Sequence, residues 1–118
     1  MAINLTVLAG ECSRPAETRV LESGTRLGVV ALRVKDTDGP ATSVPVTVWD
    51  PPAWFDELAS GDAVIVVGKV RRRFYKAGAV TGSRVDVEAE IIARAGKDRR
   101  KLITVTRRIQ DALEALEA

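Results

Sequence analysis

The chain has 118 residues, 46% of them hydrophobic and 29% charged, with a formal net charge of +2, which predicts one domain with enough apolar material for a core. No apolar run approaches the ~20 residues that span a bilayer and no secretory signal is recognisable at the N-terminus, so we expect a cytoplasmic protein without a membrane contact. Histidine is absent and Cys12 is the only cysteine, which excludes an internal disulfide and a cysteine zinc site and argues against a metal, a cofactor or catalysis.

The first half of the chain reads as short strands separated by turns. Apolar and β-branched residues recur between turn residues, which predicts strands over residues 3–10, 18–21, 27–35 and 44–49. In residues 27–35 the apolar side chains share one face and Arg33 and Lys35 the other. Cys12 is interpreted as a small core residue, and Pro45, which has no N–H, should lie at a sheet edge or bulge.

The second half adds a brief helix and two longer strands. The apolar spacing predicts a helix over residues 53–59, strands over residues 63–75 and 85–93, and a hairpin connection at residues 77–82. Asp50 is the expected helix cap, and Trp54 or Phe55 is expected to close one end of the core. Five or six short strands with one brief helix predict an all-β protein built as a small closed barrel.

Residues 96–118 differ in character from the expected domain, residues 1–95. They begin as a linker and continue as an amphipathic helix, whose apolar side chains recur at spacings of three and four. Arg107 and Arg108 precede the acids of this helix, an order that opposes the helix macrodipole. We therefore expect a compensating neighbour, either an antiparallel partner helix or an anionic ligand.

Residues 69–76 contain five cations and no acid, while acids gather elsewhere, notably in residues 86–90. Alternate side chains of a strand share a face, so one face here carries Lys69, Arg71, Arg73 and Tyr75. This row suits a single nucleic-acid strand, because cations neutralise phosphates and an aromatic ring offers a stacking surface to an unpaired base. The alternative is a solvated edge strand whose charges discourage aggregation.

Several short motifs follow one another at regular spacings. They include Asn4-Leu5-x-x-Leu8-x-Gly10, Val46-x-Val48-Trp49, Gly61-Asp62-x-Val64-x-Val66-x-Gly68 and Arg84-x-Asp86-Val87-Glu88-Ala89. In order and spacing, over residues 3–93, they resemble the bacterial single-stranded DNA-binding protein family. The resemblance implies an OB-fold, a five-stranded barrel that binds single-stranded DNA in replication, repair or recombination. It also implies a homo-oligomer, with a tetramer favoured and a dimer as the alternative.

In that family, bases stack on aromatic residues of the sheet, and Trp49 and Tyr75 fall at aromatic positions of the family pattern. Together with the nearby cations they form the candidate nucleic-acid-binding set: Arg33, Lys35, Trp49, Lys69, Arg71, Arg73, Tyr75 and Lys76. Two further positions where the family often carries tryptophan are unfilled, because Ser43 occupies one and residues 36–42 contain no aromatic.

The expected C-terminal helix is a second departure from the family pattern, since family members commonly end in a disordered segment with an acidic and hydrophobic tip. We therefore interpret the chain as a divergent or accessory member. The unfilled aromatic positions leave a second function open, that of an OB-fold protein-interaction adaptor with a decayed DNA-binding face.

Overall fold

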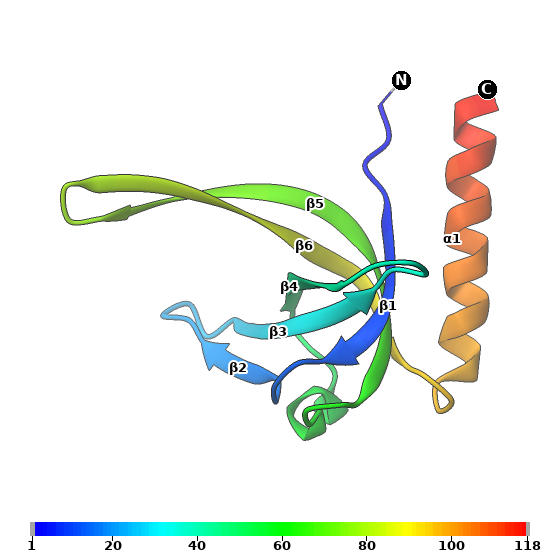
Figure 1. Ribbon diagram of the computed structural model, residues 1–118, viewed down its shortest axis with the longest axis horizontal. Helices are drawn as coiled ribbons and strands as arrows, with labels where there is room; N and C mark the ends of the chain where they lie inside the picture. Colours follow the sequence, from blue (N-terminus) through cyan, green and yellow to red (C-terminus); the bar gives the residue numbers. More distant parts are fainter. Residues whose placement is uncertain (1, 118) are drawn as a thin grey trace.

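The computed structural model describes residues 2–117 as six strands, a 3-10 helix and a C-terminal α-helix (Figure 1). In chain order these are β1 Thr6–Cys12, β2 Glu17–Val20, β3 Arg26–Lys35, β4 Ala41–Trp49, η1 Ala53–Glu57, β5 Ala63–Ala77, β6 Val80–Arg94 and α1 Arg99–Glu117. Each expected strand is present, so the all-β prediction is confirmed.

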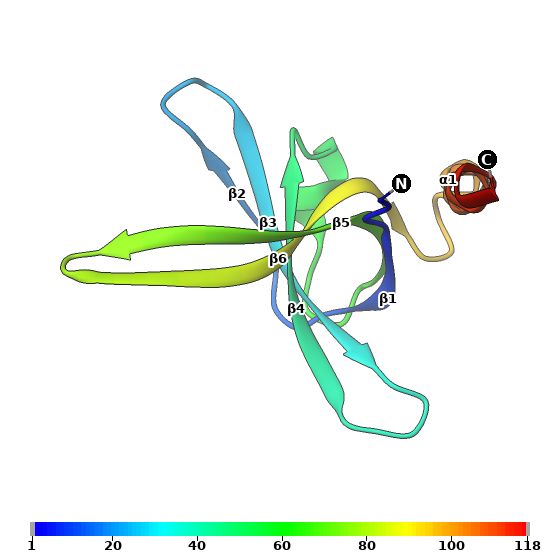
Figure 2. The same ribbon diagram turned by 90° about the horizontal axis from the view of Figure 1, so that it is seen from above.

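All six strands belong to one curled sheet of order β1-β5-β6-β4-β3-β2, and an additional β1–β3 pairing joins five of them into a ring. The neighbouring strands are antiparallel except β4 and β6, which are parallel and pair over two positions only. Viewed from above, the β2–β3, β3–β4 and β5–β6 hairpins extend away from the curled sheet in different directions (Figure 2).

The longest of these hairpins is the β5–β6 arm, which we define as residues 69–88. A hairpin connects the two strands as expected, but its turn is shorter than residues 77–82: it contains only Gly78 and Ala79, and both strands continue to it. Gly78 has φ +62°, and a glycine at the first of two turn residues is what a type II′ hairpin turn prefers. The short turn therefore extends the sheet ladder far beyond the core.

Alternation along the strands builds the core. Val30, Leu32, Val46, Val48, Val64 and Val66 are all buried in one hydrophobic cluster that also contains Cys12, which confirms the assignment of that cysteine to the core. Pro45 pairs only with Ala31 of β3 and comes directly before the β4–β6 pairing, so it lies where one side of β4 has no ladder, as expected.

The segment between β4 and β5 closes one end of the core through Phe55, which is completely buried. Gly28 makes room for it, because a Cβ at that position would lie 2.7 Å from the Phe55 ring. The segment is a single 3-10 turn, and the expected cap at Asp50 is wrong: Pro52 holds the cap position with no side-chain bond. Asp50 instead ends β4 in a left-handed conformation, with φ +52° and its N–H bonded to the Arg26 carbonyl.

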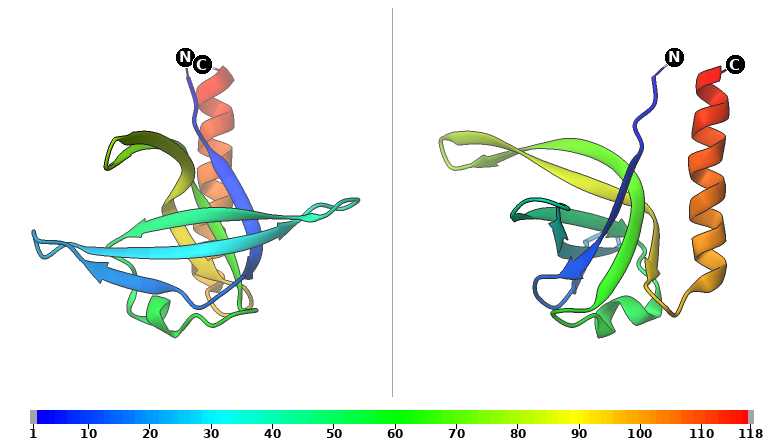
Figure 3. Two further views of the ribbon diagram at one scale, coloured as in Figure 1. Left: turned by 60° about the vertical axis from the view of Figure 1, so that its left-hand side comes forward. Right: turned by 45° about the vertical axis from the view of Figure 1, so that its right-hand side comes forward.

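Helix α1 stands beside the outer surface of the curled sheet (Figure 3). It begins at Arg99, inside the expected linker, because Asp98 fixes its start: the side chain and backbone N–H of Arg94 both donate to the Asp98 carboxylate and lower its pKa to about 2. Val105 and Ala112 are buried, whereas Leu113 and Leu116 remain exposed. The helix therefore covers only part of its apolar stripe with its own chain.

One of the two arginines that precede the acids of α1 is paired within the chain. The Arg108 guanidinium donates to the Glu90 carboxylate of β6 at 2.7 Å. Arg107 has no such ion pair within residues 2–117. None of the helices in the described part of the chain has the length and apolar content needed to cross a bilayer.

Candidate nucleic-acid interface

The basic row of β5 lies on one face, as the alternation predicts. The β5–β6 ladder sets Lys69 opposite Glu88, Arg71 opposite Asp86, Arg73 opposite Arg84 and Tyr75 opposite Gly82. We call this the outer face of the arm. The ladder also brings the acids of β6 directly against the cations of β5, which sequence spacing alone did not indicate.

These acids neutralise the basic row. Glu88 lies 3.5 Å from both the Lys69 ammonium and the Arg71 guanidinium, and Asp86 accepts a hydrogen bond from Arg73 Nε at 2.9 Å. Asp86 is buried and also accepts a 2.9 Å bond from the Thr47 hydroxyl. The expectation of a basic strand separated from the acids is therefore wrong, because two acids of the next strand pair with it.

Trp49 joins the same cluster from the end of β4. Its indole N–H donates to the Glu88 carboxylate at 2.6 Å, while 42% of the residue remains exposed. Burial acts to raise the pKa of Glu88, but the Trp49 hydrogen bond and the charges of Arg71 and Lys69 outweigh it, so the pKa is lowered. Glu88 thus stays ionised and holds both the indole edge and two cations in place.

Tyr75 lies farther along the outer face, roughly 20 Å from Lys69 at ~3.3 Å per residue. It is 51% exposed, and its ring crosses the arm over Gly82, where an added Cβ would lie 2.5 Å from the ring carbon that bears the hydroxyl. A glycine opposite an aromatic residue lets the ring lie close to the backbone. The outer face therefore carries exposed aromatic rings near each of its two ends.

The remaining candidates are not all on this face. Arg33 and Lys35 lie at the far end of β3, opposite Ser43 and Ala41 of β4, and Arg33 is 3.7 Å from Glu11. Lys76 is an even-numbered position of β5 paired with Thr81, so it points to the opposite face of the arm. Lys76 therefore does not share the face of Lys69, Arg71 and Arg73.

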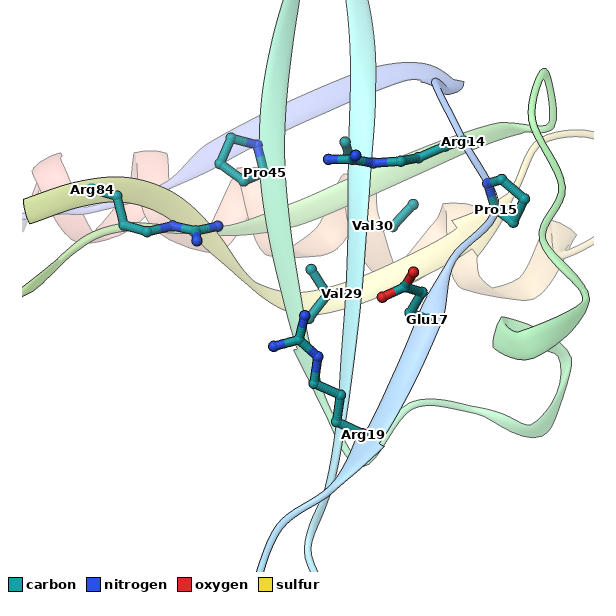
Figure 4. Close-up of a pocket in the computed structure, with 9 residues that line it drawn as sticks. Arg14, Pro15, Glu17, Arg19, Val29, Val30, Pro45 and Arg84 are labelled. Carbon is teal, nitrogen blue, oxygen red and sulfur yellow. The ribbon is translucent and has the colours of Figure 1, made fainter. Parts of the chain in front are cut away.

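A groove on the outer surface was missed in the sequence. It has a volume of about 240 Å³ and is lined by Arg14, Pro15, Glu17, Arg19, Val29, Val30, Ala31, Pro45 and Arg84. Figure 4 shows the side chains of Arg14, Arg19 and Arg84 reaching toward this groove from three different segments. We call this the arginine groove. Its arginines are isolated in the sequence and meet only because β2, β3, β4 and β6 are neighbours.

The charges of the arginine groove are not neutralised like those of the basic row. Within residues 2–117, none of Arg14, Arg19 and Arg84 forms an ion pair with an acid. Arg84 lies directly opposite Arg73 in the ladder, an arrangement of like charges that destabilises a sheet. Arg73 is paired with Asp86, and its buried Nη2 lies 3.9 Å from the Glu88 carboxylate, so of these two arginines Arg84 is the one without an ion pair within residues 2–117. This part of the surface is suited to an anion.

The ring of five strands, closed at one end by a short helical turn between β4 and β5, defines an OB-fold. The chain is similar to the wild-type single-stranded DNA binding protein from Thermus aquaticus, with a TM-score of 0.66 and 23% sequence identity. The likeness covers 80% of this chain and 41% of that protein, so the chain spans about two-fifths of its length. No protein-family model and no curated protein sequence matches this chain.

Proposed function

We propose that this protein binds single-stranded DNA with little dependence on base sequence, in replication, repair or recombination. The arginine groove carries the proposal. OB-folds bind oligonucleotides on the face of their second and third strands, between two flanking loops. With β1 and β2 counted as one interrupted strand, these correspond to β3 and β4, which form the floor of the arginine groove between the β2–β3 turn and the β5–β6 arm.

Each part of the surface has a distinct role in this proposal. Arg14, Arg19 and Arg84 bind phosphates, because within residues 2–117 none of them is held in an ion pair, and Glu17 is the one acid among the residues that line the groove. Trp49 and Tyr75 stack on bases. The cations of the basic row bind phosphate more weakly, since they must first give up Glu88 or Asp86. Arg33 and Lys35 extend the positive surface along β3.

Removal of Arg84 tests the groove. Each phosphate contact on a single strand contributes about −0.7 to the slope of log affinity against log salt. Arg84→Ser should therefore flatten the slope measured with oligo-dT by roughly 0.7. Arg107→Ser is the matched control, because it removes the same charge from α1 without touching the groove, and its slope should equal that of the unmodified protein. Equal slopes for all three proteins would contradict the role of the groove.

The second candidate function is a protein-interaction adaptor. The pairing of Lys69, Arg71 and Arg73 with Glu88 and Asp86 favours it, because the predicted DNA face is partly neutralised. An adaptor would show no oligo-dT binding even at low salt, whereas a DNA-binding protein would bind most strongly there.

We also propose that the chain forms a homo-oligomer, with a tetramer favoured and a dimer as the alternative. Leu113 and Leu116 of α1 are exposed, and an antiparallel pair of α1 helices would set Arg107 of one copy beside the acids of the other. Each exposed ion pair contributes well under ~1 kcal/mol, so apolar burial must dominate the association and the charges set its direction.

Two variants test the part played by α1. Truncation after Gly96 should lower the mass measured by light scattering, and it also tests whether the expected domain, residues 1–95, folds without residues 97–118. Because truncation uncovers the sheet surface under α1, a second variant, Leu113→Glu with Leu116→Glu, keeps the helix and alters only exposed positions. An unchanged mass in the double variant would show that this helix face does not drive assembly. A monomeric unmodified protein would refute the oligomer.

A further inference from the structure

The inner face of the arm, opposite its outer face, displays an exposed aromatic side chain between two cations. Phe74 is 75% exposed, more than any other large hydrophobic residue of the described chain. Arg72 and Lys76 flank it two positions away on the same strand, and therefore on the same face. The cross-strand neighbours on this face are Val85, Ser83 and Thr81.

The inner face differs from the outer face in its charge balance. Every acid of the arm belongs to the outer face, where it pairs with the basic row. Within residues 2–117, neither Arg72 nor Lys76 forms an ion pair, and the Arg72 guanidinium donates only to the Ser83 hydroxyl, at 3.0 Å. The face therefore presents two positive charges without a counterion.

We propose that the inner face is a second contact surface for the same nucleic-acid strand, with Phe74 stacked on a base and Arg72 and Lys76 bound to phosphates. This inference rests on the proposed function. A strand bound in the arginine groove reaches the arm at Arg84, which belongs to both. From there it passes around the arm, so that Tyr75 and Phe74, consecutive residues on opposite faces, contact successive parts of it.

The chemistry favours a nucleic acid over a protein as the occupant. A ring exposed over most of its surface, with an unpaired cation on each side, matches the alternation of bases and phosphates in a single strand. Two smaller apolar side chains of this face, Val70 and Val85, are also exposed, whereas Val87 is buried in the core. A purely apolar partner would leave Arg72 and Lys76 desolvated without a counter-charge.

Oligo-dT of two lengths tests the inference. OB-folds engage roughly 4–16 nucleotides each, so an oligo-dT of about 10 nucleotides fills the groove and one of about 30 also reaches around the arm. Phe74→Ala should weaken binding of the long oligo-dT roughly fivefold or more and leave the affinity for the short oligo-dT unchanged. Tyr75→Ala, its matched neighbour, should weaken both. Arg72→Ser with Lys76→Ser should flatten the slope of log affinity against log salt, measured with the long oligo-dT, by about 1.4.

The outcomes separate this inference from the proposed function. If Phe74→Ala binds both lengths like the unmodified protein while Tyr75→Ala weakens both, the inner face is not a contact and the proposed function stands. If the unmodified protein binds oligo-dT of neither length, both the inference and the proposed function are contradicted. Phe74→Leu keeps the apolar surface without the ring, so normal DNA binding by this variant would overturn stacking. A lower mass of Phe74→Ala in light scattering, with unchanged DNA affinity, would identify an interface between copies instead.

Discussion

Alanine in place of Trp49 or Tyr75 is expected to weaken oligo-dT binding by about 1–3 kcal/mol each, roughly 5- to 150-fold. Both rings are partly exposed on the same face, and a stacked base covers an aromatic surface that alanine does not offer. The two rings are far apart, since Trp49 lies beside Glu88 at the end of β4 and Tyr75 lies opposite Gly82 near the tip of the arm, so their effects should add. Neither side chain belongs to the core cluster, so both variants should keep their fold.

Fluorescence titration with oligo-dT measures this effect, and Trp49 itself should be quenched when a base stacks on it. Trp54→Phe removes the second tryptophan of the chain, which packs against the core beneath Arg94, so the remaining emission reports on Trp49 alone. Glu88→Gln is a useful companion variant, because it removes the charge next to Trp49 while keeping a side chain of the same size. Unchanged affinity in both alanine variants would contradict the stacking surface.

Phe55→Ala is expected to lower the free energy of unfolding by about 3–5 kcal/mol, the usual cost of emptying a fully buried aromatic site. Phe55 is completely buried, and its ring sits against Gly28, where a larger side chain cannot enter without displacing it. The rest of the core comes from strands fixed by ladder hydrogen bonds, so the site cannot collapse easily around the missing ring.

Urea unfolding followed by circular dichroism measures the loss. Ile103→Ala is the matched control, because Ile103 is an exposed apolar residue of α1 and its truncation should change the free energy of unfolding by well under 1 kcal/mol, about the scale of surface substitutions. A Phe55→Ala variant as stable as this control would mean that the 3-10 segment does not close the core.

The strands and the core could be predicted because the alternation of apolar and polar side chains is visible within a few consecutive residues. Alternation over a few residues placed Val30, Val46 and Val64 inside, and it placed Lys69, Arg71 and Arg73 on one face. The burial of Cys12 and the edge position of Pro45 follow from the same kind of reasoning, since each depends on the chemistry of one residue. These expectations were confirmed.

The charge balance of the site could not be predicted in this way. The pairing of Glu88 with Lys69 depends on the register between two strands, and a shift of one position would send the acid to the other face. The arginine groove depends on residues 14, 19 and 84 meeting across four strands. Single arginines carry no periodic pattern, so only the strand order reveals them.

Local sequence preferences also gave the wrong position for the start of α1 and for the turn between β5 and β6. Residues 102–106 are rich in β-branched residues, which have a weak preference against helix, but the Asp98 bonds and the burial of Val105 outweigh it, and the helix begins at Arg99 inside the expected linker. The glycines at 78 and 82 suggested a loop, yet Gly82 stays in the ladder beneath the Tyr75 ring. Tertiary contacts decided both cases.

Binding of fluorescent oligo-dT by the unmodified protein, measured at two salt concentrations, tests the proposed function most directly. Three unpaired arginines at about −0.7 each predict a slope of log affinity against log salt of roughly −2 or steeper, with the tightest binding at low salt. Replacement of oligo-dT by another base sequence should change the affinity little. No binding at low salt, or an affinity that does not depend on salt, would contradict the proposal that this OB-fold binds single-stranded DNA.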